Sequence, residues 1–195
     1  RAIAEYEAVQ QGNLDRPEAW MHLGNLAALR GDPAAAEAAY REALKRDRRF
    51  VPAYVNLADV RREQRREADA ESILREGLRV VPDAPALREA LGLALVRQGK
   101  KDAALAEFAA ARKSAPAEAR YAYLYALALH DAGRRAEAIR LMADTAKRSG
   151  DRDVLLALAL YRSEAGDEAG AREALQRLAS VNPGDPALAQ MRAPR

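Results

Sequence analysis

The chain has 195 residues, of which 49% are hydrophobic and 31% are charged, a balance that indicates a folded protein with a sizeable core. Its 32 basic and 29 acidic residues leave a net charge of only +3, which disfavours a dedicated nucleic-acid binder. The absence of cysteine excludes disulfides and thiolate metal sites. No apolar run is long enough to span a bilayer, so we expect no membrane insertion.

Residues that favour helices dominate the composition: alanine, leucine, arginine and glutamate. Threonine occurs once and phenylalanine twice, so the residues that favour strands are scarce. The sequence therefore predicts an all-α fold. The first residue is Arg1, and no signal-peptide pattern precedes it, so we expect a fragment of a longer chain. Both the cytoplasm and the periplasm remain open as its compartment.

A pattern that recurs every 34 residues organises the chain from its N-terminus onward. Residues 1–16 fit the second helix and exit loop of a partial repeat. Five full helix–turn–helix units follow, at 17–50, 51–84, 85–118, 119–151 and 152–185. Residues 186–195 fit the start of a further or capping helix. The chain 1–195 is thus predicted to be one array, and its uncapped ends, with Ile3 and Tyr6 partly bare, predict self-association.

Small and large residues occupy fixed columns of this repeat. One small column reads Gly24, Ala58, Gly92, Ala126 and Ala159. Another is alanine throughout: Ala36, Ala70, Ala104, Ala138 and Ala171. A bulky column reads Tyr40, Leu74, Phe108, Met142 and Leu175. Large residues three or four apart give a helix an apolar stripe, and small residues let the neighbouring helix approach closely.

The turn inside each unit has its own signal. Four units place glycine there: Gly31, Gly99, Gly133 and Gly166. Glycine at this point predicts a left-handed backbone conformation that ends the first helix. Asp32 and Pro33 then predict the N-cap and the first turn of a second helix. The second unit has Arg65 instead, so we expect strain at this turn and the lowest stability among the inner units.

These columns resemble the tetratricopeptide repeat (TPR) family over nearly the whole chain. Pentatricopeptide repeats, which bind RNA, have a period one residue longer and fit the small columns less well. The TPR resemblance implies a right-handed superhelical solenoid of antiparallel helix pairs. It implies a non-catalytic scaffold that binds a protein or peptide partner, as an extended segment or a helix, in a concave groove. The implied groove residues are Met21, His22, Asn25, Asn56, Asp59, Leu93, Arg97, Tyr123, Leu127 and Leu160.

Two asparagines match part of a site known in the family. Chaperone-binding members hold a terminal carboxylate with two asparagines and three basic residues, and Asn25 and Asn56 match the two asparagine positions. Met21, Ala86 and Ala90 replace the basic ones. Without cations the carboxylate would lack its charge-assisted hydrogen bonds, so we do not expect a carboxylate clamp.

Neither a catalytic motif nor a cofactor motif stands out. His22 and His130 fall in different units, and we expect no enzyme activity, metal or cofactor. An alternative function is the accessory arm of a larger enzyme or electron-transfer protein, packed on its own catalytic domain. Residues 50–59 are similar to repeat regions attached to bacterial multihaem cytochromes, although the sequence contains no haem-attachment motif.

A basic rim is predicted at the turns of successive units: Arg65, Arg66, Lys100, Lys101, Arg134 and Arg135. Stacked repeats would place these residues along one edge. The rim would then either be solvated or steer an acidic partner. In the fifth unit, Asp167 and Glu168 interrupt the row.

Overall fold

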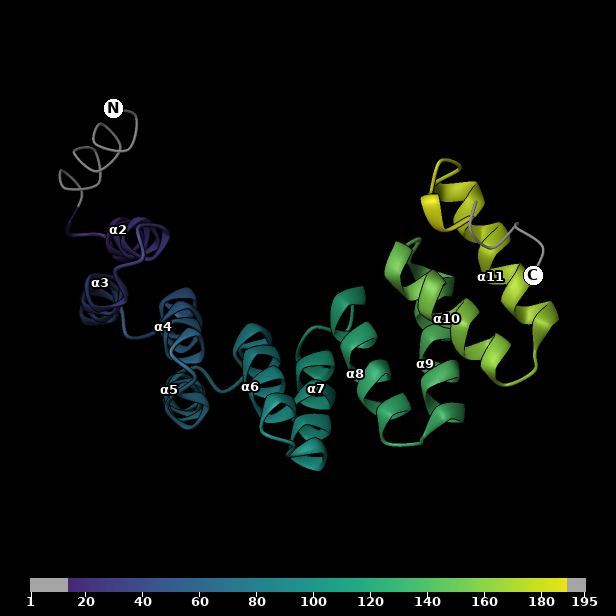
Figure 1. The fold of residues 1–195 in the computed structure, drawn as a ribbon, viewed down its shortest axis with the longest axis horizontal. Coiled ribbons are helices and arrows are strands. Elements are labelled where there is room, and N and C mark those ends of the chain that lie inside the picture. The colour runs from purple at the N-terminus through teal and green to yellow at the C-terminus, as the bar shows by residue number, and fades with distance from the viewer. Residues whose placement is uncertain (1–13, 189–195) are drawn as a thin grey trace. The chain divides into compact units, whose positions relative to one another are not determined.

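The computed structural model describes residues 14–188, which contain ten α-helices and no strand (Figure 1). The helices are α2 (Pro17–Leu29), α3 (Pro33–Arg46), α4 (Val51–Glu63), α5 (Glu67–Val80), α6 (Pro85–Arg97), α7 (Lys101–Ser114), α8 (Ala119–Asp131), α9 (Arg135–Arg148), α10 (Arg152–Glu164) and α11 (Glu168–Val181). The predicted all-α class is confirmed. None of these helices is long and apolar enough to cross a bilayer. The expected partial repeat, with Ile3 and Tyr6, and the further helix lie largely outside the described residues.

The helices form two compact units, divided after Ser114. The first unit holds α2 to α7, and the second holds α8 to α11. Consecutive helices pair in each unit, joined by short turns. In the first unit, α2 also contacts α4, and α4 contacts α6. In the second, α8 contacts α10. The first helices of neighbouring pairs therefore lie against one another, which places their side chains on a shared surface.

The small column that contains Gly24 and Gly92 allows the two helices of a pair to pack closely. A Cβ atom built on Gly24 would lie 2.5 Å from the ring of Tyr40. One built on Gly92 would lie 2.5 Å from the ring of Phe108. The alanine column is buried in all five pairs: Ala36, Ala70, Ala104, Ala138 and Ala171. The predicted contact of bulky side chains with a bare backbone is therefore confirmed.

The turns adopt the predicted left-handed conformation. The four turn glycines have φ between 74° and 80°, and Arg65 has φ 59°. Arg65 is the one non-glycine residue with positive φ in the described part of the chain. Asp32 caps α3 by accepting a hydrogen bond from the backbone N–H of Ala35 at 2.9 Å. Sequence signals at the turns thus translate directly into backbone geometry.

The fourth residue of a first helix ties that helix to the loop before it. Trp20, Tyr54 and Arg88 each donate a side-chain hydrogen bond to the backbone carbonyl six positions earlier, at 2.8, 3.1 and 2.8 Å. Arg88 also forms an ion pair with Glu107 at 3.0 Å. Arg88 therefore anchors its helix in the same way as Trp20 and Tyr54 anchor theirs. The sequence pattern did not reveal this role of the arginine.

Candidate functional site

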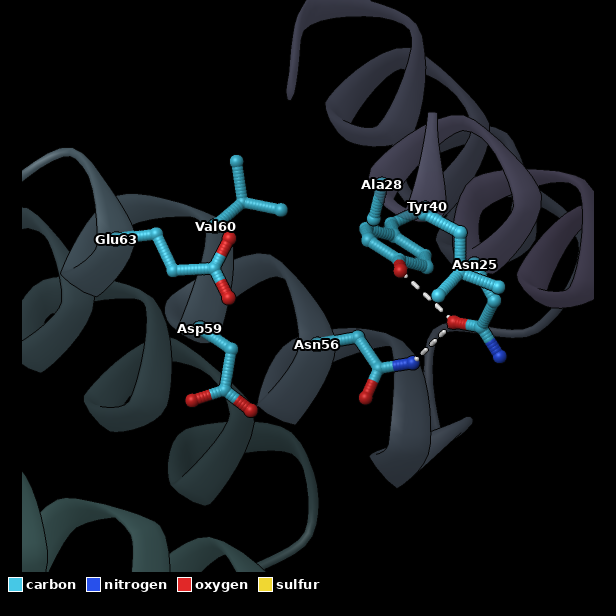
Figure 2. A pocket seen from close by; sticks show the side chains of 8 residues that line it. Asn25, Ala28, Tyr40, Asn56, Asp59, Val60 and Glu63 are labelled. Carbon is cyan, nitrogen blue, oxygen red and sulfur yellow. Dashed lines mark hydrogen bonds between the residues drawn. The ribbon is translucent and has the colours of Figure 1, made fainter. Parts of the chain in front are cut away.

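Asn25 and Asn56, on adjacent first helices, meet in the structure (Figure 2). Asn56 Nδ2 donates a hydrogen bond to Asn25 Oδ1 at 2.9 Å. The Tyr40 hydroxyl donates to the same oxygen at 2.8 Å. One amide oxygen therefore joins α2, α3 and α4. The amide nitrogen of Asn25 and the amide oxygen of Asn56 lie outside these two bonds, and such groups suit the N–H and C=O of a peptide backbone.

A cavity of about 440 Å³ opens beside this network. We call it the first-helix pocket, and its lining is Asn25, Ala28, Leu29, Tyr40, Asn56, Asp59, Val60 and Glu63. The four residues from α4 have the spacing i, i+3, i+4 and i+7, which places them on one helix face. The sequence predicted Asn25, Asn56 and Asp59. It missed Tyr40, which the column pattern places in the core, and Glu63, although helical spacing from Asn56 provides the signal for Glu63.

The charge of the first-helix pocket is negative. Two of its lining residues, Asp59 and Glu63, are acidic, and none is basic. Burial raises the pKa of the Tyr40 phenol, the nearby Asn56 amide lowers it, and the charges of Asp59 and Glu63 raise it further, so that the pKa lies above its ordinary value. Arg62, outside the lining, pairs with Asp59 at 3.0 Å and with Glu63 at 3.8 Å. The pocket thus combines amide groups and carboxylates with an apolar wall.

Other predicted residues of the first unit do not line this pocket. Met21 is half-buried and packs against the core. His22 is also half-buried. Leu93 on α6 is 38% exposed. The Arg97 guanidinium donates to both carboxylate oxygens of Glu67 at 3.1 Å, which links α6 to α5. These four residues lie outside the lining of the first-helix pocket, and their place in a longer groove stays a prediction.

The second unit contains the remaining predicted groove residues. Tyr123 and Leu127 are half-buried on α8, and Leu160 on α10 is 51% exposed. Burial raises the pKa of the Tyr123 phenol, and the charges of Asp153 and Asp151 add to this effect. Tyr123 is thus close to acidic groups, as Tyr40 is in the first unit.

His130 and Tyr161 form a contact that the sequence did not predict. Their rings stack with centroids 4.0 Å apart, and His130 Nε2 lies 2.8 Å from Glu164 Oε2. Burial raises the pKa of Tyr161 to about 12, and Tyr123 and Glu164 contribute. This histidine joins α8 to α10. In residues 14–188 no three histidine, aspartate or glutamate side chains are placed to hold a metal ion.

Ion pairs neutralise part of the predicted basic rim. Arg66, Lys100 and Arg134 pair at 2.5, 2.8 and 2.7 Å with acidic residues of second helices: Asp69, Glu71 and Glu137. The other three rim residues are exposed: Arg65, Lys101 and Arg135. Each ion pair reduces the charge available for steering a partner. A continuous basic strip along the turns stays a prediction.

Family models described as tetratricopeptide repeat match residues 1–52 together with 89–154, residues 27–93, and residues 153–185. The first of these models alone covers more than half of the chain. The chain belongs to the tetratricopeptide repeat family. Its sequence therefore places it among TPR proteins, whose helix pairs the structure reproduces. No curated protein sequence gives a significant match to this TPR chain.

Solved structures share the fold of this TPR chain. PilW, described as a widely conserved type IV pilus biogenesis factor, matches with a TM-score of 0.75 and 17% identity over 98% of this chain and 90% of its own. YrrB, described as a TPR protein with an unusual peptide-binding site, matches with a TM-score of 0.64 and 20% identity over 95% of this chain and 96% of its own. PilF of Pseudomonas aeruginosa matches with a TM-score of 0.67 and 19% identity over 96% of this chain and 95% of its own. Identities this low show the fold alone.

Proposed function

We propose that this TPR chain is a non-catalytic scaffold that binds a peptide segment of a protein partner in the first-helix pocket. The observation that carries the proposal is the cavity of about 440 Å³ beside the Asn25–Asn56–Tyr40 network. Membership of the TPR family supports a protein partner. The peptide-binding site in the description of YrrB supports a peptide ligand.

The lining indicates which peptide would bind. Amide groups of Asn25 and Asn56 suit the backbone of an extended segment, because each amide both donates and accepts hydrogen bonds. Asp59 and Glu63 suit a lysine or arginine side chain. The methylene stem of such a side chain would pack on the apolar wall near Leu29, whose side chain is 85% exposed. A terminal carboxylate is disfavoured, since no cation lines the pocket.

A second contact area is proposed within the second unit. Tyr123, Leu127 and Leu160 lie on its first helices and combine apolar surface with one phenol group. Tyrosine contributes large contact area at low entropic cost, so Tyr123 is the best candidate for an anchoring contact there. Tyr123→Ala should therefore weaken binding of a natural partner, whereas Arg140→Ala, on the exposed side of second helix α9, should not.

The test of the first-helix pocket uses a fluorescein-labelled basic probe of sequence Lys-Leu-Arg-Ala-Lys-Leu-Arg-Ala, titrated with the full chain at low ionic strength. Asp59→Asn combined with Glu63→Gln should weaken binding about tenfold, because two charge contacts are lost. Asn56→Ala should also weaken binding. A matched control, Asp83→Asn with Glu118→Gln, removes two exposed acidic groups outside the pocket and should have little effect.

Two results would contradict the proposal. One is equal loss of affinity in the pocket variant and the matched control, which would mean that net charge alone attracts the probe. The other is an affinity for the basic probe that is unchanged both in Asn56→Ala and in the variant that combines Asp59→Asn with Glu63→Gln. Circular dichroism melts of all variants would show that the fold is retained.

A further inference from the structure

A second cavity, of about 390 Å³, lies in the first unit on the side of the second helices. We call it the second-helix pocket, and its lining is Arg41, Leu44, Lys45, Arg48, Tyr54, Leu57, Ile73 and Glu76. These residues come from α3, the loop after it, α4 and α5. The pocket shares no lining residue with the first-helix pocket, although both are built on α3 and α4.

The charge of the second-helix pocket is opposite to that of the first-helix pocket. Its lining contains three basic residues and one acidic residue, Glu76. The sequence shows the same bias, because residues 41–49 contain five basic and two acidic side chains. This segment covers the end of α3 and the loop before α4, where cations are also favoured by the helix dipole.

The cations around the pocket are available to a ligand. Arg41 pairs with Glu37 at 2.9 Å, and its side chain is 58% exposed. Lys45 pairs with Glu42 at 2.5 Å, and its side chain is 67% exposed. Exposed ion pairs of this kind within one helix contribute little to stability, so a ligand carboxylate can replace the partner at little cost. Arg48 is exposed in the loop.

The floor of the pocket is apolar. Leu57 is buried, and Leu44 and Ile73 are partly buried against the core cluster that includes it. The Tyr54 ring is buried, and its hydroxyl donates to the backbone carbonyl of Arg48 at 3.1 Å. This bond fixes the loop that carries the Arg48 side chain. An apolar floor surrounded by cations is suited to a segment that has both an apolar side chain and carboxylates.

We propose that the second-helix pocket is a second interaction surface, which binds an acidic segment of a partner protein with one apolar side chain seated between Leu44 and Ile73. Arg41, Lys45 and Arg48 bind carboxylates on either side of that anchor. The same repeats therefore hold two partner segments of opposite charge, one on the first helices and one on the second helices. Charge selects the segment that binds each pocket.

The experiment uses the full chain and an acidic probe, Asp-Leu-Glu-Ala-Asp-Leu-Glu-Ala, with the same pattern as the basic probe. Fluorescence anisotropy at low ionic strength should show binding, and Arg41→Gln with Arg48→Gln should weaken it about tenfold. Glutamine keeps helix propensity, so this variant should fold. The matched control, Arg172→Gln with Arg177→Gln, removes two exposed arginines from α11 and should have little effect. A probe with serine in place of leucine should bind more weakly, because the anchor is lost.

Amide chemical shifts locate the bound probe. Shifts centred on Leu44, Arg48 and Ile73 are expected, with Asn25 and Asn56 unaffected. Shifts at the asparagines instead, equal weakening in both arginine variants, or the absence of binding would overturn the proposal. Analytical ultracentrifugation tests a second copy as the occupant. Self-association that disappears in the Arg41 and Arg48 variant would assign the surface to another copy of this chain and would also overturn it.

Discussion

The first-helix and second-helix pockets are built on the same two helices and differ in nearly every chemical property. Helix α4 contributes Asn56 and Asp59 to one and Tyr54 and Leu57 to the other. Helix α3 contributes the Tyr40 hydroxyl to the first and Arg41 to the second. One pocket is lined by amides and carboxylates, whereas the other is lined by cations over an apolar floor.

The difference shows how one helix serves two surfaces. Because side chains at i, i+3, i+4 and i+7 share a helix face, adjacent residues in the sequence face different neighbours. Tyr40 and Arg41 are adjacent, yet Tyr40 is 3% exposed and Arg41 is exposed. Tyr40, which lines the first-helix pocket only, packs closely against Gly24 of α2, so that contact is the first thing to disturb.

The largest effect is expected from Gly24→Leu. A Cβ atom added at this position would lie 2.5 Å from the Tyr40 ring, so any side chain must displace the ring. We expect a loss of about 2 kcal/mol in the free energy of unfolding, measured by urea denaturation. Displacement of Tyr40 should also break its hydrogen bond to Asn25 and weaken binding of the basic probe.

Gly92→Leu is the matched control for that variant, because Gly92 contacts Phe108 in the same way in a pair that lines neither pocket. It should lose similar stability and keep both binding activities. If Gly24→Leu weakened the basic and acidic probes to the same extent, the two pockets would not be independent, and the comparison would fail.

A smaller effect is expected at Glu71, whose carboxylate forms ion pairs with Arg75 and with Lys100. The pKa of Glu71 is lowered to about 2, mainly because Lys100 donates to its carboxylate, with Arg75 and Gln98 contributing. A carboxyl group with a lowered folded pKa stabilises the fold above its ordinary value of 4.5, and this contribution is lost as pH falls towards about 2.

Glu71→Gln should therefore cost about 1 kcal/mol near neutral pH, after allowance for the exposure of its partners, and the cost should decline between pH 4.5 and 2. Glu42→Gln, which affects pairs within α3 only, should change stability little. Thermal melts across this pH range provide the measurement. A cost independent of pH would show that Glu71 acts through packing rather than charge.

The smallest effect is expected at Arg65, at the end of the helix that lines both pockets. Its φ of 59° is costly for a residue with a Cβ atom, by about 1–2 kcal/mol. Arg65→Gly should stabilise the chain by about 0.5 kcal/mol, since glycine also gains freedom in the unfolded state. Binding of both probes should stay unchanged, because neither pocket contains Arg65.

Hydrogen exchange provides a second measurement for Arg65. Amides of residues 51–84 should exchange faster than those of 85–118 in the parent chain, because a strained turn lowers local stability. The Arg65→Gly variant should reduce the difference. Protection in 51–84 equal to that in 85–118, together with an unchanged melting temperature for the variant, would contradict the interpretation of this turn as the weak point.

Several features of the fold could be read from the sequence because they depend on local physics. Turn glycines recur where the backbone must be left-handed, and Asp32 with Pro33 fits only the start of a helix. Small and bulky columns follow the helical period and predict close helix packing, which the approach of Tyr40 to Gly24 confirms. The family resemblance also placed Asn25 and Asn56 on one surface.

Only the tertiary structure decided which polar side chains meet. The hydrogen bond between Asn25 and Asn56 spans 31 residues, and the His130–Tyr161 stack also joins separate helices. Lys100 pairs with Glu71, 29 residues away, rather than extending a free rim. Such contacts depend on rotamers and on distances of a few ångströms between helices, which periodicity does not specify. The sequence by itself therefore determined the helix pairs and their turns, whereas helix packing determined the shape and charge of the two pockets.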